Sequence, residues 1–248
     1  MYDRLSCETL YDPLALAEET EKIVVKGRLR KYYRKARSGK WYGGISSAYC
    51  CGCNLRCVFC WSGFPRDNPD KIGEFYDPEQ VFNQLRRVAS THGYSQLRIT
   101  GNEPTIGKDH LSGILELVDQ SNFNFILETN GILIGHDRHY ADQLSRFKNL
   151  HVRVSLKGIS RREFSRLTGA KPEAFDFQLK ALKNLLDAQV SFHPALMVSF
   201  SSDAGIQQLK GKLVEIDQSL TASLEEEHVI LYPPVVKRLK KAGIQPNE

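Results

Sequence analysis

Cys53-Asn54-Leu55-Arg56-Cys57-Val58-Phe59-Cys60 is the stretch around which the rest of the chain is arranged. Its three thiols are separated by gaps of three and two residues, which are too short for disulfide partners inside regular structure. Such spacing suits a loop that wraps once around a compact metal centre. Three ligands rather than four would leave one corner of a four-iron cubane free for a small molecule, just as catalytic zinc sites keep an open position.

Patterns typical of strands and helices alternate about six times along the chain. Such alternation indicates right-handed βαβ units and a parallel sheet. We therefore predict an α/β fold, an open (βα)6 TIM-like partial barrel with its chemistry at the carboxyl ends of the strands. The predicted strands cover residues 41–49, 96–100, 125–129, 151–155, 191–200 and 228–232. The predicted helices cover 13–35, a segment from 78 with Asp77 as N-cap, a segment capped by Asp109, 137–147, 160–167, 174–188, 203–220 and 235–241.

The octapeptide, with aromatic Phe59 just before its last cysteine, resembles the signature of the radical S-adenosylmethionine (radical SAM) family. The resemblance extends over residues 41–202 and implies the same (βα)6 architecture. It also implies that Cys53, Cys57 and Cys60 hold a [4Fe–4S] cluster that passes one electron to bound S-adenosylmethionine. The products would be methionine and a 5′-deoxyadenosyl radical, which takes a hydrogen atom from the substrate.

A segment at the next strand end and two aromatic residues beside Cys60 support this resemblance. Gly101-Asn102-Glu103-Pro104 is similar to the Gly-Gly-Glu-Pro segment of the family, and Asn tolerates the left-handed conformations that a glycine position can require. Carbonyls at this turn and the Glu103 carboxylate would accept hydrogen bonds from the ammonium of S-adenosylmethionine. Phe59 would pack near the adenine or simply fill the core, and Trp61 would form a wall of the cavity.

Three later strand ends carry further candidates for binding S-adenosylmethionine. Thr129 and Asn130 lie in a Thr-Asn-Gly segment found in the branch that activates glycyl radical enzymes, although a plain Asn-Gly turn explains them equally well. Ser155 and Lys157 are two residues apart on a strand, so they project to the same side. The branch often has an acidic residue where Ser155 stands, and a lysine like Lys157 for the carboxylate. Ser199 stands where similar enzymes place a further ligand to the methionine end.

Within this reading, we expect an activase that takes hydrogen from a glycine of a partner protein, with flavodoxin or ferredoxin as electron donor. The same chemistry on a small molecule or an RNA base is the alternative. A rival from another class is a zinc-bearing nucleic-acid-binding module, with Cys50 or Cys51 as fourth thiolate. Its phosphate contacts would come from the basic run of residues 26–40, which otherwise reads as a solvated helix face.

Composition places few other bounds on the chain. A hydrophobic fraction of 41%, a charged fraction of 25% and a net charge of +5 are ordinary for a globular protein of 248 residues. There is no apolar run long enough to cross a membrane and no apolar core of a signal peptide, so we expect a cytoplasmic protein in which Cys7 is a free thiol. The predicted division is an N-terminal helical and basic extension (1–40), the barrel (41–232) and a C-terminal helix or tail (233–248).

Overall fold

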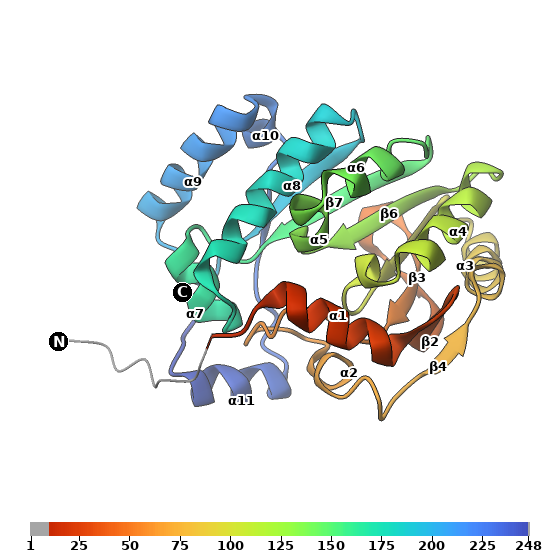
Figure 1. Cartoon of the computed structure of the whole chain (residues 1–248), viewed down its shortest axis with the longest axis horizontal. Coiled ribbons are helices and arrows are strands. Elements are labelled where there is room, and N and C mark those ends of the chain that lie inside the picture. The colour runs from red at the N-terminus through yellow and green to blue at the C-terminus, as the bar shows by residue number, and fades with distance from the viewer. Residues whose placement is uncertain (1–9, 248) are drawn as a thin grey trace.

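The computed structural model describes residues 10–247, so Cys7 lies outside the described residues. Figure 1 shows a twisted sheet with helices packed along it. Within the described residues, β3, β5, β6, β7, β8 and β9 are parallel neighbours in that order, and the antiparallel strands β2, β1 and β4 extend the β3 edge. Since β1 and β9 end the strand order, the sheet is open. The predicted (βα)6 partial barrel is therefore confirmed.

The strands are β1 (Val25–Lys26), β2 (Leu29–Gly39), β3 (Ile45–Cys50), β4 (Glu74–Tyr76), β5 (Gln96–Thr100), β6 (Asn124–Thr129), β7 (Leu150–Leu156), β8 (Phe192–Met197) and β9 (Glu225–Glu227). The α-helices are α1 (Pro13–Val24), α2 (Gly63–Asp67), α3 (Pro78–His92), α4 (Lys108–Asp119), α5 (Ile132–His136), α6 (Arg138–Leu144), α7 (Arg161–Thr168), α8 (Phe175–Asp187), α9 (Asp203–Ile216), α10 (Ser219–Ala222) and α11 (Pro233–Ala242). Short 3-10 turns are η1 (Trp41–Gly43), η2 (Pro104–Ile106) and η3 (Pro172–Ala174). Among the described helices, none is long and apolar enough to span a bilayer.

Helix α3 shows how local sequence sets these elements. Asp77 accepts a hydrogen bond from the Gln80 backbone N–H, the Gln80 side chain accepts one from the Asp77 N–H, and Pro78 opens the first turn. This is a capping box, which satisfies amide groups that the first turn leaves free. Gly93 ends the helix in the left-handed conformation, φ 68°. The buried side of the helix then packs against the sheet through Val81, Phe82, Leu85 and Ala89.

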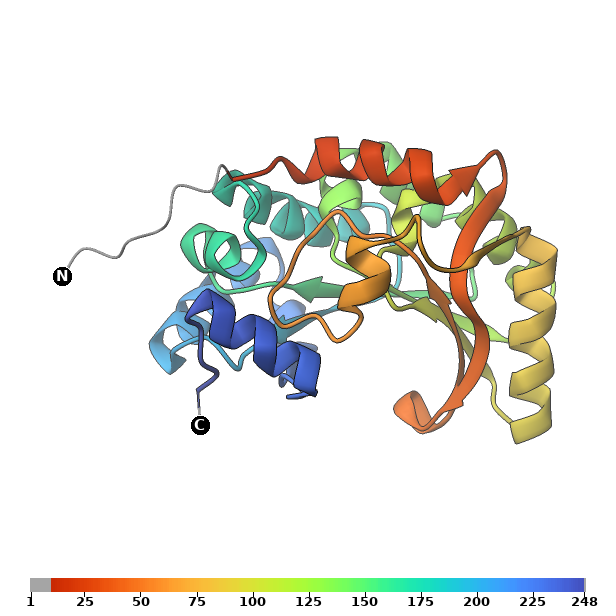
Figure 2. The ribbon, with the colours of Figure 1, turned by 90° about the horizontal axis from the view of Figure 1, so that it is seen from below.

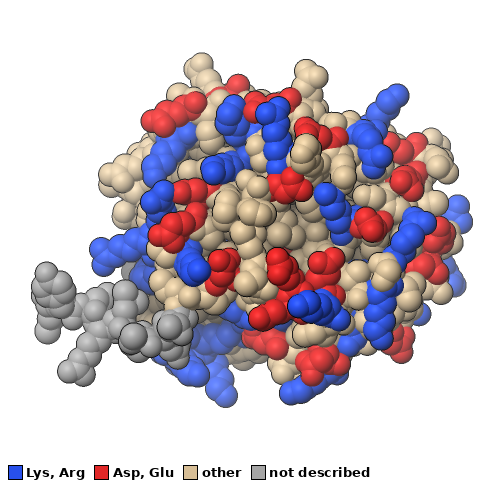
Figure 3. Space-filling view, in the orientation of Figure 1, with Lys and Arg blue, Asp and Glu red and all other residues tan. Residues whose placement is uncertain are grey.

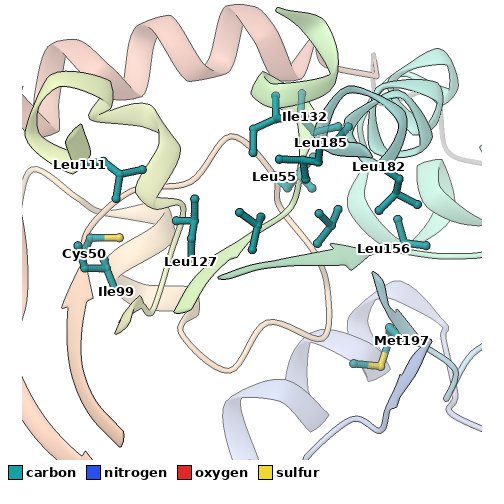
Figure 4. Packing of buried hydrophobic residues seen from close by; sticks show 14 of the residues in the cluster. Cys50, Leu55, Ile99, Leu111, Leu127, Ile132, Leu156, Leu182, Leu185 and Met197 are labelled. Carbon is teal, nitrogen blue, oxygen red and sulfur yellow. The ribbon is translucent and has the colours of Figure 1, made fainter. Parts of the chain in front are cut away.

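A continuous apolar core lies between the parallel strands and the helices that cover them. Strand residues such as Ile99, Leu127 and Leu156 are almost completely buried. Leu55, from the cysteine loop itself, is 1% exposed and belongs to the same cluster (Figure 4). Burial of a leucine contributes about 1.5–3 kcal/mol. The loop is therefore anchored to the core between its first and second cysteines.

The helix predicted for residues 13–35 is correct only as far as Val24. Residues 25–39 form β1 and β2 instead, and β2 pairs with β3 along Tyr32↔Cys50 through Gly39↔Ile45. Tyrosines suit strands, and pairing with the exposed edge of β3 outweighs the helical composition of this segment. The basic run is thus part of the sheet and not a solvated helix face, while the predicted domain division stays a prediction.

Three predicted boundaries were also wrong. The strand expected over 41–49 begins at Ile45, because η1 and the positive φ of Gly44 (126°) turn the chain first. Asp109 does not cap α4; it lies in the first turn, and Gly107 occupies the N-cap position. The strand expected over 228–232 lies earlier, at Glu225–Glu227. Glu225 and Glu227 of this strand pair with Arg153 of β7, and Glu225 also pairs with His193 of β8, which the apolar pattern of residues 229–232 did not reveal.

Candidate functional site

One cavity of about 880 Å³ opens at the carboxyl ends of the parallel strands. Parallel barrels place their active sites there, and the volume is in the range of small-molecule sites. Ser199 is the one proposed site residue that does not line it. The proposed site residues that do line it are Cys53, Cys57, Phe59, Cys60, Gly101, Asn102, Glu103, Thr129, Asn130, Ser155 and Lys157.

The cysteine loop places three thiols on this cavity. Cys53 Sγ accepts hydrogen bonds from the Leu55 backbone N–H (3.3 Å) and from the Asn130 amide (3.8 Å). Cys50 and Cys51 are buried but do not line the cavity, and Cys51 Sγ instead donates to the Ile72 carbonyl at 3.5 Å. The three thiols of the signature therefore line the cavity, and the two preceding cysteines do not.

Two arginines hold the cysteine loop from outside. Arg66 of α2 donates to the Cys57 carbonyl at 2.5 Å. Arg238 of α11 donates to the Val58 carbonyl at 3.1 Å and also to the Cys60 carbonyl. Figure 2 shows α11, in dark blue, near the orange segment that contains the loop and α2. Arg238 was not predicted, since nothing in the local sequence links residue 238 to a loop 178 residues earlier.

The chemistry of these thiols fits an iron–sulfur cluster. Burial raises the pKa of Cys53, and it raises the pKa of Cys57 to about 11, so neither is a thiolate at neutral pH without a cation. Cluster irons supply that charge. No group of three His, Cys, Asp or Glu side chains within residues 10–247 is placed to hold a single metal ion. A cubane needs no such convergence, because each thiolate binds a different iron.

Glu103 joins the second and third strand-end segments. Its carboxylate is buried and accepts hydrogen bonds from the Thr105 backbone N–H (3.2 Å), the Thr105 hydroxyl (2.7 Å), the Thr129 hydroxyl (2.7 Å) and the Asn130 backbone N–H (2.8 Å). Burial raises the pKa of Glu103 despite these bonds. Three donors share Oε1 and one uses Oε2, so Oε2 keeps a lone pair for a ligand ammonium.

The turn before Glu103 offers a further acceptor. Gly101 has φ 94°, a conformation that strains other residues. Asn102 Nδ2 donates to the carbonyls of Ser62 and Gly101, whereas its buried Oδ1 has no partner among the described residues. A buried acceptor without a donor costs free energy. An ammonium group would satisfy it, as expected for the amino group of S-adenosylmethionine.

Thr129 and Asn130 mainly shape the site. The Thr129 hydroxyl donates to Glu103 and accepts from the Gly131 N–H at 3.1 Å. The Asn130 amide donates to Asn54 Oδ1 at 2.7 Å, and its oxygen accepts from the Ile132 N–H at 3.0 Å. Both side chains are thus committed to neighbouring groups, so the Thr-Asn-Gly segment fixes Glu103 and the cysteine loop relative to each other.

The strand residues of β7 face the cavity as their alternation predicted. Arg153 pairs with Glu225 (2.8 Å) and Glu227 (2.9 Å) of β9, and the Ser155 hydroxyl donates to Glu227 at 2.9 Å. The two glutamates were missed, although their spacing of two places them on one side of a strand. The His193 contact and the Arg153 guanidinium lower the pKa of Glu225 to about 2. The carboxylate that Ser155 lacks is therefore adjacent, on Glu227.

Lys157 and the aromatic residues complete the end of the cavity near the cysteines. Lys157 Nζ lies 5.9 Å from the centre of the Phe59 ring, and no ion pair joins it to Glu103 or Glu128. Phe59 is buried and stacks on Phe200 with ring centres 5.4 Å apart. Trp61 lines the cavity at 51% exposure. The Ser199 hydroxyl instead accepts from the Val229 N–H at 2.9 Å.

Comparison with known proteins decides the family. The model of the Radical SAM superfamily matches residues 48–206, which is more than half of the chain. The chain belongs to the radical SAM superfamily. Its cofactors are accordingly a [4Fe–4S] cluster and S-adenosylmethionine, and Cys53, Cys57 and Cys60 would hold the cluster. When bound, the cluster supplies the electron that cleaves S-adenosylmethionine to a carbon radical.

Individual relatives of this radical SAM chain are more distant. It is 28% identical over 184 residues to a protein named "Probable GTP 3′,8-cyclase" from Saccharolobus islandicus, and 26% identical over 183 residues to one of the same name from Sulfurisphaera tokodaii. Each match covers 74% of this chain and 54% of the relative, so the chain spans about half the length of these curated relatives. Their printed name is that of a small-molecule enzyme.

Solved structures share the fold of the chain. Streptococcus suis SuiB bound to S-adenosylmethionine aligns with a TM-score of 0.60 at 19% identity, covering 77% of this chain and 44% of SuiB. The structure of TYW1 with a lysine-pyruvate adduct bound aligns with a TM-score of 0.51 at 15% identity, covering 94% of this chain and 89% of the other. These likenesses support the partial barrel.

Proposed function

We propose that this radical SAM enzyme abstracts a hydrogen atom from a small molecule held in the same cavity as S-adenosylmethionine. The observation that carries this proposal is the extent of the cavity. Beyond the cysteines and the Asn102–Glu103 turn, it continues to Tyr42, Arg98 and Ile230. These walls are left over once S-adenosylmethionine has its partners, and they belong to the same cavity, so a second small molecule can lie beside it.

The residues of the chain would divide the work between two ligands. Asn102 Oδ1 and Glu103 Oε2 would accept from the amino group of S-adenosylmethionine, and Lys157 would pair with its carboxylate. Glu227 would accept from hydroxyl groups of its ribose, with Arg153 and Ser155 fixing the carboxylate. Arg98, paired with Glu128 at 2.6 Å, would stay on the substrate side.

A small-molecule substrate also agrees with the name that the curated relatives carry, and a purine nucleotide is the first substrate to test. Activation of a glycyl radical enzyme is the second candidate. It is favoured by the Thr129–Gly131 and Ser155–Lys157 segments, although Thr129 and Asn130 make contacts that any substrate would tolerate. Flavodoxin or ferredoxin remains our proposed electron donor. On the face in Figure 3, cations and carboxylates are interspersed, and this face offers no broad basic surface for nucleic acid.

The test is anaerobic turnover of the reconstituted protein. With dithionite and S-adenosylmethionine, we expect 5′-deoxyadenosine by mass spectrometry, and faster formation when the substrate is present. GTP and other nucleotides form the first panel, with the Cys57→Ala variant as control. A glycyl radical signal in a co-purified partner would favour the activase instead. Absence of 5′-deoxyadenosine from protein that carries about four irons per chain would overturn the proposal.

A further inference from the structure

Strand β2 contains two irregularities that change which side chains face the cavity. Its register with β3 shifts between Tyr32 and Arg34, and again between Arg34 and Arg37. In each case β2 has one residue more than β3, which is the pattern of a β-bulge. In a regular strand, residues 34 and 37 would point to opposite faces, because side chains alternate. The second bulge removes that opposition.

The pairing partners confirm the direction. Arg34 is opposite Tyr49 and Arg37 is opposite Ser47, and these two β3 residues are two apart, so they share a face. Arg34, Arg37 and Tyr49 all line the cavity. Tyr32, before the first bulge, is opposite Cys50 and is buried in the core. Two extra residues thus bring two guanidinium groups to one wall of the site.

These guanidiniums are uncommitted, unlike the other arginines of the cavity. Arg98 pairs with Glu128 at 2.6 Å, and Arg153 pairs with both carboxylates of β9. The fourth carboxylate on the cavity, Glu103, accepts four hydrogen bonds and is buried. Among residues 10–247, neither Arg34 nor Arg37 forms an ion pair or a side-chain hydrogen bond. Every carboxylate on the cavity is therefore occupied elsewhere.

Aromatic rings lie next to the Arg34 guanidinium. The Arg34 guanidinium carbon is 5.7 Å from the centre of the Tyr49 ring, and Tyr33 and Trp61 contact the same ring with centres 5.7 and 6.0 Å apart. Trp61 is half exposed on the cavity wall. Flat apolar surfaces beside planar forked donors are suited to a ligand that combines a ring with phosphate groups.

We propose that Arg34 and Arg37 form a subsite for the phosphates of a nucleotide substrate, with Trp61 and Tyr49 beside its base. This deepens the proposed function and rests on it. The phosphates could belong to a free nucleotide or to an RNA chain, and the cavity volume of about 880 Å³, which is in the range of small-molecule sites, favours the free nucleotide. Lys157 lies over Phe59, near the cysteines, and is left for S-adenosylmethionine.

The test is anaerobic calorimetry of the holoenzyme with S-adenosylmethionine bound, using GTP, guanosine, inorganic tripolyphosphate and an RNA oligonucleotide as probes. We expect GTP to bind more tightly than guanosine. The double variant Arg34→Gln/Arg37→Gln should weaken GTP binding by about tenfold or more and leave guanosine binding unchanged. The matched control is Lys35→Gln/Lys40→Gln, which removes the same charge from the same region but from side chains that do not line the cavity. Iron content and affinity for S-adenosylmethionine report whether each variant is intact.

Three results would overturn the subsite. They are equal binding of GTP by the wild type and the arginine variant, equal weakening by the lysine control, and tight binding of an RNA oligonucleotide without binding of GTP. Failure of the proposed function can be distinguished from failure of the subsite. If dithionite yields no 5′-deoxyadenosine, the radical chemistry fails while the GTP titration still reports on the arginines. If 5′-deoxyadenosine forms but GTP does not bind, only the subsite fails.

Discussion

His110 should make the stability of this protein fall as the pH is lowered from neutral. Its ring is 2% exposed and joins α4 to β2, with Nδ1 2.8 Å from the Arg28 carbonyl and Nε2 2.9 Å from the Tyr32 hydroxyl. A carbonyl only accepts, so Nδ1 carries the proton and Nε2 accepts from Tyr32. Protonation of Nε2 would therefore turn the Tyr32 hydroxyl from donor to acceptor and would place a positive charge in a buried site.

The size of this effect follows from the pKa. Burial lowers the pKa of His110 from 6.5 to about 4. In the unfolded chain His110 is protonated below about pH 6.5, whereas in the native protein it is protonated only below about pH 4. Stability is therefore lost as the pH falls from 6.5 to 4. At 1.36 kcal/mol per pKa unit, the full effect is about 3 kcal/mol, and about 2 kcal/mol of it falls between pH 7 and pH 5.

Replacement by glutamine removes the titration while keeping one donor and one acceptor. We expect the free energy of unfolding of the wild type to fall between pH 7 and pH 5 by about 2 kcal/mol more than that of His110→Gln. Anaerobic urea unfolding followed by tryptophan fluorescence measures this difference, with His92→Gln, on the exposed end of α3, as control. Parallel pH dependence of the wild type and His110→Gln would refute the reasoning.

Three further variants test the site and its supports. Cys57→Ala should lose most of its iron in anaerobic iron analysis, whereas Cys51→Ala, a thiol off the cavity, should keep it; iron retained by both would contradict the cluster assignment. Glu103→Gln puts an amide donor among four donors, so we expect a loss of about 2–3 kcal/mol in urea unfolding and weaker binding of S-adenosylmethionine by calorimetry. Because the pKa of Glu225 is lowered to about 2, its stabilising effect is present above pH 4.5 and is lost as the pH falls towards 2. Glu225→Gln should therefore reduce the pH dependence of the free energy of unfolding in this range. The same result from Glu226→Gln would argue against the Arg153 and His193 contacts as the cause.

Local patterns determined much of this molecule. The spacing of Cys53, Cys57 and Cys60 predicted a cluster loop, because ligands so close in the chain can reach one centre without help from distant residues. Periodicity and caps placed most strands and helices, as at Asp77 before α3. Alternation along β7 and into the residue that follows it put Ser155 and Lys157 on the cavity wall, since side chains of an extended chain alternate between its two faces.

Tertiary structure alone decided the features whose partners are distant in the sequence and those where a bulge breaks the alternation of side chains along a strand. Glu225 and Arg153 are 72 residues apart, and Arg238 reaches Cys60 across 178. Residues 29–39 became a strand because the edge of β3 was available to pair, and no local propensity encodes that edge. The bulges that turn Arg34 and Arg37 to one side arise from the register between β2 and β3. Register depends on how the two strands pair, and the sequence of neither strand specifies it alone.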